Sequence, residues 1–220
     1  MATFRGVTDR IRGTVAQALR DQVAQGLDER VREMLVASVA LWQKAGWTSH
    51  DGDEGDCTVQ VYRWCQYLAR HDHRFVFVSV HCEWVHVTPA MFAGTEKVKA
   101  ARRPDLRFEV GAIGRTIECK RLAPRGGWAR AYVYDGLARF VVGVYAEDEP
   151  VGYMIGYAQD GRPTELVEKI NVQVSGHPSM GDPHQLEFLA TDENVLWSRS
   201  NHQRADSTLI TVDHLLVEVG

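Results

Sequence analysis

Two carboxylates and one ammonium group, those of Asp105, Glu118 and Lys120, flank a single predicted turn in this sequence. A hard divalent cation such as Mg2+ takes oxygen ligands, is commonly held by one or two carboxylates, and keeps several waters. Such an ion polarises a phosphoryl oxygen and lowers the pKa of a bound water. Lys120 can act as a base only if burial or a nearby cation lowers its pKa; otherwise it would orient a water or offset negative charge.

The sequence between these residues has the pattern of a β-hairpin, because polar and apolar residues alternate on both sides of the turn segment GAIG at 111–114. With the turn centred on residues 112 and 113, Asp105 lies opposite Lys120. In the same register, Arg107 lies opposite Glu118. Directly opposite side chains are roughly 5 Å apart, so these four side chains should share one face. The predicted strands are Asp105–Val110 and Arg115–Leu122, and the apolar residues of the opposite face are Leu106, Phe108, Val110, Ile117 and Cys119.

The motif Pro104-Asp105 followed by Glu118-Cys119-Lys120 resembles that of the PD-(D/E)XK nuclease superfamily, which has the restriction-endonuclease-like fold. The resemblance implies that Asp105 and Glu118 hold a metal ion and that the main-chain carbonyl of Cys119 adds a ligand. It also implies that Lys120 assists catalysis. Mg2+ is then the expected cofactor, with Mn2+ as a substitute, and DNA is the expected substrate.

Five further charged residues are candidates at such a site. In the superfamily, a glutamate on a helix before the hairpin sometimes joins the metal ligands, and Glu29 and Glu33 lie on a predicted helix. Glu83, in a predicted strand, is a spare candidate ligand. Arg121 and Arg139 are candidate substrate-binding residues, because an arginine can bind a backbone phosphate. An exposed surface position is the alternative for each of them.

The alternative for the hairpin itself is a solvated face with cross-strand ion pairs, of which Asp105 with Lys120 would be one. The segment 118–120 precedes a long predicted helix, however, as expected for a central strand. Buried charges are rare unless they are paired or functional.

Positive charge is concentrated around the hairpin. Residues 96–130 contain ten Lys and Arg but four Asp and Glu, a local charge of +6 in a chain whose net charge is −4. A phosphate-binding surface requires such a local excess and not a basic total. A solvated charged face would have the same composition.

The chain has 220 residues, 45% hydrophobic and 25% charged, which is typical of a globular domain with a substantial core. We expect a single domain over 1–220, with N-terminal helices at 1–47, a catalytic core at 74–160 and C-terminal strands at 186–219. The four cysteines show no CxxC spacing, and no signal peptide or apolar run of ~18 residues is present. These features predict a cytoplasmic protein with reduced thiols and no membrane association.

The remaining periodicity predicts an α/β fold with a mixed central sheet flanked by helices, an N-terminal helical segment and a C-terminal β extension. Gly26 should separate two N-terminal helices, the second capped by Asp28. Residues 49–56 (SHDGDEGD) should form a solvated acidic loop. Helices are predicted at 8–23, 28–44, 59–69, 129–140 and 163–174, and strands at 74–87, 141–145, 151–157, 186–190, 194–199 and 208–219.

Two other groups of polar residues are less informative. The spacings of His71, His73, His81, Cys82 and His86 match no common zinc pattern. Three residues predicted to lie between the last strands could touch a phosphate, or could belong to a polar hairpin loop: Ser200, His202 and Arg204.

The sequence therefore predicts a Mg2+-dependent nuclease acting on DNA. The segments RFVVGVYA (139–146) and GYMIGYAQDG (152–161) resemble small bacterial members of the superfamily that work in phage defence. That resemblance implies a defence effector with partner subunits or a homo-oligomer. The alternative is a nuclease-fold module that grips nucleic acid or a partner protein without cutting. A serine or thiol hydrolase has little support, because no GxSxG motif occurs and Cys119 is predicted on the core face.

Overall fold

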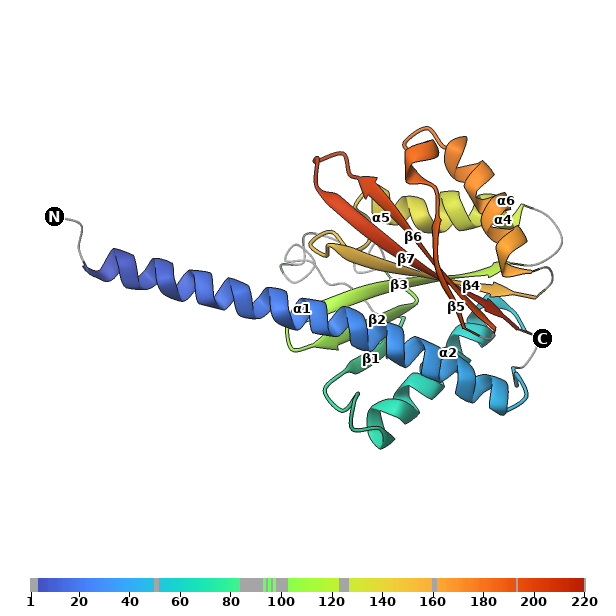
Figure 1. Cartoon of the computed structure of the whole chain (residues 1–220), viewed down its shortest axis with the longest axis horizontal. Helices are drawn as coiled ribbons and strands as arrows, with labels where there is room; N and C mark the ends of the chain where they lie inside the picture. The colour runs from blue at the N-terminus through green and yellow to red at the C-terminus, as the bar shows by residue number, and fades with distance from the viewer. Residues whose placement is uncertain are drawn as a thin grey trace.

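The computed structural model describes residues 4–49, 52–83, 93, 95, 97, 103–122, 127–159, 162–192 and 194–219. These residues form an α/β protein around a seven-stranded mixed sheet with the strand order β1-β2-β3-β4-β7-β6-β5 (Figure 1). The predicted α/β class, N-terminal helical segment and C-terminal strands are confirmed.

The helices are α1 (Phe4–Lys44), α2 (Glu54–His71), α4 (Trp128–Ala131), α5 (Ala138–Val141) and α6 (Pro163–Ser175), with a π-helical turn η2 (Tyr132–Leu137) between α4 and α5 and a 3-10 turn η3 (Asp182–His184). The strands are β1 (Ser79–Cys82), β2 (Leu106–Val110), β3 (Ile113–Leu122), β4 (Val151–Ala158), β5 (Glu187–Asp192), β6 (Val195–Gln203) and β7 (Leu209–Glu218).

The sheet has an antiparallel part on each side of a parallel centre. Strands β1, β2 and β3 pair antiparallel, β3 pairs parallel with β4, and β4 pairs parallel with β7. Strands β7, β6 and β5 are again antiparallel. Parallel neighbours need a crossover connection, and the helical segment α4-η2-α5 supplies it between β3 and β4. Strand β3 is therefore an internal strand.

The N-terminal region is one helix of 41 residues, so the prediction of two helices separated at Gly26 is wrong. A single glycine costs a helix only about 1 kcal/mol relative to alanine. Burial of the side chains on the same face outweighs that cost. This face carries the buried residues Leu27, Val31, Leu35 and Val39, four positions apart. The first part of α1 projects beyond the body of the protein (Figure 1).

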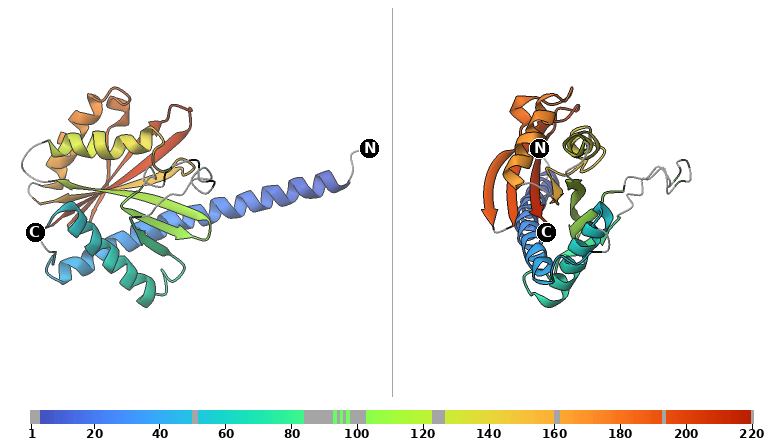
Figure 2. Two further views of the ribbon diagram at one scale, coloured as in Figure 1. Left: turned by 180° about the vertical axis from the view of Figure 1, so that it is seen from behind. Right: turned by 90° about the vertical axis from the view of Figure 1, so that its right-hand side faces the viewer.

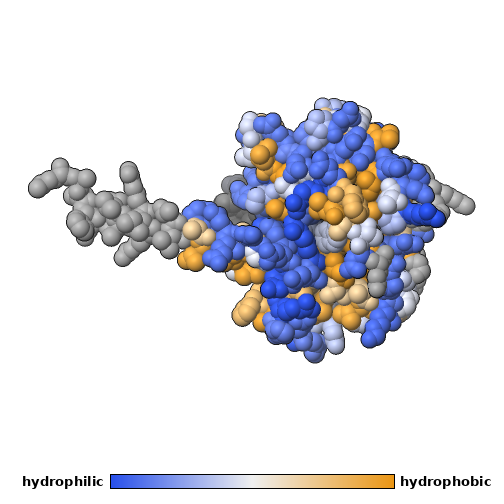
Figure 3. Space-filling view, in the orientation of Figure 1, coloured by the Kyte–Doolittle hydropathy of each residue, from blue (hydrophilic) through white to orange (hydrophobic). Residues whose placement is uncertain are grey.

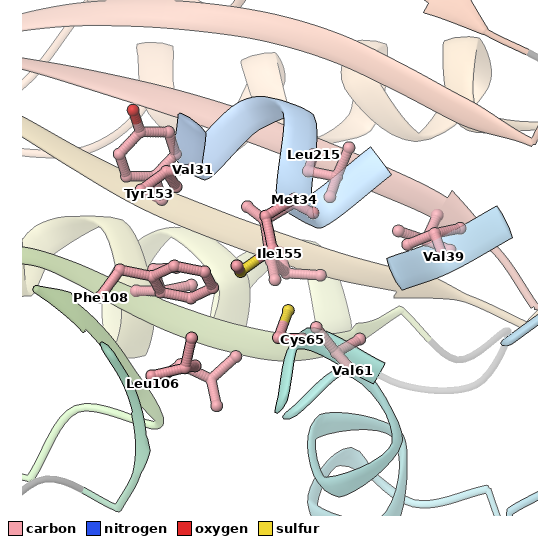
Figure 4. Packing of buried hydrophobic residues seen from close by; sticks show 14 of the residues in the cluster. Val31, Met34, Val39, Val61, Cys65, Leu106, Phe108, Tyr153, Ile155 and Leu215 are labelled. Atoms are coloured by element: carbon pink, nitrogen blue, oxygen red, sulfur yellow. The ribbon is translucent and has the colours of Figure 1, made fainter. Parts of the chain in front are cut away.

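Helices cover both faces of the sheet, so the protein has two apolar clusters (Figure 2). Helices α1 and α2 pack on one face, where Met34 and Cys65 contact the cluster that includes Phe108 and Ile155 (Figure 4). The segment α4-η2-α5 and α6 pack on the other face, in the cluster that includes Met154. Burial on both faces explains why β4 reads as an almost continuous apolar run.

The hairpin of β2 and β3 has the predicted faces but a different register. Leu106 pairs with Ile117 and Arg107 with Thr116, so the predicted pairing of Arg107 with Glu118 is wrong by two positions. The turn lies one residue earlier than predicted, where Gly111 adopts a φ of 61°, the left-handed conformation that glycine tolerates. Side chains alternate with a period of two. A shift of two positions therefore leaves every residue on its predicted face.

Other predicted elements had mixed outcomes. The helices at 59–69, 129–140 and 163–174 and the strands at 151–157, 186–190, 194–199 and 208–219 are confirmed. The strand predicted at 141–145 is wrong, because α5 ends at Val141 and the chain then turns through Gly143, which has a φ of 71°. Of the strand predicted at 74–87, Ser79–Cys82 is a strand, and residues 84–87 lie outside the described residues.

The surface seen in the orientation of Figure 1 is largely hydrophilic, with scattered apolar patches (Figure 3). Within the described parts of the chain, no helix combines the length and the apolar character that a bilayer crossing requires.

Candidate functional site

The fold brings Asp105, Glu118 and Lys120 together, as the alternating pattern of the hairpin sequence predicted. Asp105 directly precedes β2, and its Oδ2 accepts a hydrogen bond from the backbone N–H of Cys119 at 2.6 Å. Glu118 and Lys120 lie on the face of β3 that the segment α4-η2-α5 covers. The side chain of Cys119 points to the opposite face, where it is fully buried and its Sγ accepts a hydrogen bond from Tyr157.

Glu118 is the central group of this site. Its side chain is 1% exposed, and Oε1 accepts from Lys120 Nζ at 2.7 Å and from Arg139 Nη1 at 2.9 Å. Its Oε2 is buried and has no hydrogen-bond partner. A buried carboxylate oxygen without a partner is costly. This oxygen therefore has an unmet hydrogen-bonding capacity inside the protein.

The electrostatics of the two acids reflect their burial. Burial, helped by the negative charge of Asp105, raises the pKa of Glu118 to about 7, although Lys120 and Arg139 act in the opposite direction. Burial likewise raises the pKa of Asp105, against the hydrogen bond from Cys119 and the positive charge of Lys120. A buried carboxylate with a strongly shifted pKa beside charged partners, as Glu118 is, is a candidate functional group.

Lys120 is held as an ammonium ion. Its Nζ lies 2.7 Å from Glu118 Oε1, 3.2 Å from Glu54 Oε1 and 2.8 Å from the carbonyl oxygen of Cys119. Burial tends to lower its pKa, but Glu118, Glu54 and Asp105 together raise it above the ordinary value. A lysine with a raised pKa is a poor general base at neutral pH. It is instead suited to hold a fixed positive charge.

Glu54 belongs to the site, and the sequence analysis missed it. It is the first residue of α2, whose N-cap Asp53 accepts a hydrogen bond from the N–H of Asp56. Its Oε2 accepts from the backbone N–H of Arg121 at 2.9 Å, and its Oε1 contacts Lys120. The prediction of a solvated loop at 49–56 is therefore wrong for residues 54–56. The capping aspartate followed by acids in the first turn was the signal that a helix begins there.

The other candidate acids lie elsewhere or touch the site only through the backbone. Glu29 and Glu33 are exposed on α1, where Glu33 pairs with Arg30, so the exposed helix position is confirmed for both and neither joins the site. The N–H of Glu83 donates to the carbonyl of Asp105 at 2.9 Å, while its own side chain is exposed.

The two candidate arginines differ. Arg139, on α5, reaches Glu118 and also donates to the hydroxyl of Tyr145 at 2.8 Å, yet its side chain remains 42% exposed. Arg139 can therefore meet a ligand from solvent. Arg121 is exposed and donates to Gln159 Oε1 at 2.6 Å instead.

Ser200 and His202 lie within β6 and are buried, so the prediction that they lie in a loop between two strands is wrong, and neither can contact a phosphate from solvent. Ser200 Oγ lies 2.7 Å from His202 Nε2 and 2.8 Å from His214 Nε2, and His214 Nδ1 lies 2.9 Å from the hydroxyl of Tyr132. Arg204 is also buried and donates to main-chain carbonyls, including that of Phe140. These residues stabilise the core.

This buried histidine network predicts acid sensitivity. Burial, with the neighbouring His184 and His177, lowers the pKa of His202 to about 3. The unfolded chain then binds a proton below pH ~6.5 that the folded chain does not, so the free energy of unfolding falls as the pH falls. We expect His202 to contribute a loss of about 2 kcal/mol between pH ~7.5 and pH ~5. Urea unfolding at both pH values should show that the free energy of unfolding falls less for His202→Asn than for the wild type. An equal fall in the two proteins would contradict this prediction.

Three oxygen donors of this site are of the kind that binds Mg2+. The buried, unpaired Oε2 of Glu118, the neighbouring carboxylate of Asp105 and the carbonyl of Cys119 are hard oxygen donors of the kind that Mg2+ prefers. Among the described residues, no group of three or more His, Cys, Asp or Glu side chains is placed to hold a metal ion. The donors are thus two carboxylates and a carbonyl, a set that Mg2+ accepts when water completes its coordination. Of the histidines and the cysteine considered for zinc, His81 pairs with Glu109 at 3.4 Å, and His86 lies outside the described residues.

No protein-family model, curated protein or solved structure matches this chain.

Proposed function

We propose that this protein is a Mg2+-dependent nuclease that hydrolyses phosphodiester bonds, with DNA as its substrate. The observation that carries the proposal is the state of Glu118. This carboxylate is buried in an internal strand beside Asp105, and one of its oxygens has no partner although two cations bind the other. Such an arrangement is energetically unfavourable as a purely structural feature, and it is well suited to a bound cation.

Asp105, Glu118 and the main-chain carbonyl of Cys119 would hold the ion, and Mn2+ should replace Mg2+. When bound, the ion would supply Lewis acidity toward a phosphoryl oxygen and lower the pKa of a water ligand. Lys120, held as an ammonium ion by Glu118 and Glu54, would offset negative charge on the phosphate. Arg139, partly exposed beside Glu118, would orient the phosphate.

The order of elements also supports the proposal. Among the described residues between Glu54 and Ala158, a helix (α2), three antiparallel strands, a crossover helix and a parallel fourth strand occur in this order. Asp105 directly precedes the second strand, and Glu118 and Lys120 lie in the third. This is the arrangement that the resemblance to the PD-(D/E)XK superfamily leads us to expect, and membership of that superfamily is part of the proposal.

The test is incubation of supercoiled plasmid with the purified protein and Mg2+, compared with the same incubation in EDTA. We expect nicked and linear products with Mg2+ and with Mn2+, and intact plasmid in EDTA, because the reaction needs the bound ion. Cleavage that continues in EDTA would overturn the proposal. Binding of DNA in the presence of Mg2+ without any cleavage would favour the alternative, a nuclease-fold module that binds without cutting.

A further inference from the structure

The outer side of the helical layer contains an open hollow between α4 and α6. The hollow has a volume of about 320 Å3, and its lining includes Trp128 and Arg130 from α4 and Lys169 and Val172 from α6. The two helices lie side by side in Figure 1. Val172 is 68% exposed, so the hollow has an apolar wall that faces solvent.

Two cations stand beside aromatic rings at this hollow. The guanidinium carbon of Arg130 lies 4.1 Å from the centre of the Tyr134 ring, and Lys169 Nζ lies 6.0 Å from the centre of the Trp128 ring. In the part of the chain that the structure describes, neither cation forms an ion pair with a carboxylate. Glu165 precedes Lys169 by one helical turn but is not bonded to it. Within the described ranges, Arg130 and Lys169 are therefore free of ion pairs, although Glu165 and Glu168 on α6 lower the net charge beside Lys169.

We propose that this hollow binds a single-stranded segment of nucleic acid, with an unpaired base stacked on Trp128 and its backbone phosphates on Lys169 and Arg130. Aromatic rings bind unpaired bases of any sequence through stacking, and nearby cations follow the backbone. A base in a duplex is stacked and paired already, so a duplex cannot use the ring in this way. An open hollow also buries too little of a free nucleotide to bind it tightly alone.

The place of the hollow relative to the candidate site favours a strand as the occupant. Trp128 begins the same helical segment that carries Arg139 eleven residues later, about 16 Å along a helix. Between them, Gly136 packs over Lys120: a Cβ at Gly136 would lie 3.4 Å from Lys120 Cγ. The segment thus covers the sheet face that carries the candidate site, and a strand bound at the partly exposed Arg139 could continue along its solvent-facing side to Trp128. The inference rests on the proposed nuclease function and narrows its substrate to nucleic acid with a single-stranded part.

The test measures binding in EDTA, where cleavage does not interfere, by the fluorescence anisotropy of a short labelled oligothymidylate. Trp128→Ala and Lys169→Gln should each weaken binding of the single strand about tenfold, and should leave binding of a blunt duplex unchanged. Trp128 also packs against the core cluster, so Lys169→Gln, an exposed substitution, guards against a folding defect. Tyr67→Ala and Lys44→Gln, which change an exposed aromatic residue and an exposed lysine far from the hollow, are the matched controls.

The outcomes separate this inference from the nuclease proposal. Wild-type affinity in both variants would overturn the inference even if the protein cuts DNA. An equal loss for single strand and duplex would also overturn it, because stacking on Trp128 requires an unpaired base. Thymidine monophosphate is the last competitor. If it displaces the labelled strand as well, per nucleotide, as the unlabelled oligonucleotide does, the hollow binds a free nucleotide and the inference is overturned. If the two variants lose single-strand binding selectively but the wild type does not cleave DNA, the binding role of the hollow is supported and the nuclease proposal is refuted.

Discussion

Glu118→Gln should abolish Mg2+-dependent cleavage, lowering the rate about 10³-fold or more, since a bound ion contributes several kcal/mol of transition-state stabilisation. The substitution keeps the shape of the side chain but removes the charge that would hold the ion. It also leaves Lys120 and Arg139 without the carboxylate that binds both of them. The measurement is the initial rate of plasmid nicking in Mg2+.

Stability must be followed in parallel, because the buried charge of Glu118 is itself costly. Its pKa is raised to about 7, chiefly by burial. The neutral amide removes that cost but leaves the buried ammonium of Lys120 without its carboxylate. Urea unfolding of the metal-free variant must therefore show that it is folded at the assay temperature before a loss of activity is ascribed to the site. The matched control is Glu33→Gln on the exposed side of α1, which should cut at the wild-type rate. Full activity in Glu118→Gln would refute the proposed site.

Arg115→Ala should destabilise the fold by about 3–5 kcal/mol, the usual cost of leaving a buried charge without its partner. Arg115 is 2% exposed and binds both carboxylate oxygens of Asp28 on α1, at 2.6 and 2.9 Å. It also donates to the carbonyls of Ala24 and Gly114. The substitution would leave Asp28, which lies against the sheet and also accepts from Tyr153, without its cation.

The measurement is the midpoint of urea unfolding followed by circular dichroism. Arg30→Ala is the matched control, because Arg30 forms an ion pair with Glu33 on the same helix but both side chains are more than 40% exposed. An exposed pair contributes at most about 1 kcal/mol. Equal midpoints for Arg115→Ala and the wild type would contradict the role of the Asp28–Arg115 pair in holding α1 to the sheet.

The sequence alone determined which residues share a face of the hairpin. Alternation has a period of two, so Asp105, Glu118 and Lys120 stay on one side even though the turn lies one residue from its predicted place. The helices and strands with strong periodicity were predictable for the same reason, because burial of one face leaves a local pattern. The α/β class followed from their order.

Only the tertiary structure decided which distant residues meet at that face. Glu54 reaches Lys120 across 66 positions of sequence, and Arg139 reaches Glu118 from the crossover helix. Neither contact leaves a local pattern, since each depends on how a helix packs on the sheet. Burial likewise assigned Ser200 and His202 to the core, where the Ser200 hydroxyl bonds to His202 and to His214 in place of water. A polar residue has the same letter in a loop and in a buried network, and packing alone tells the two apart.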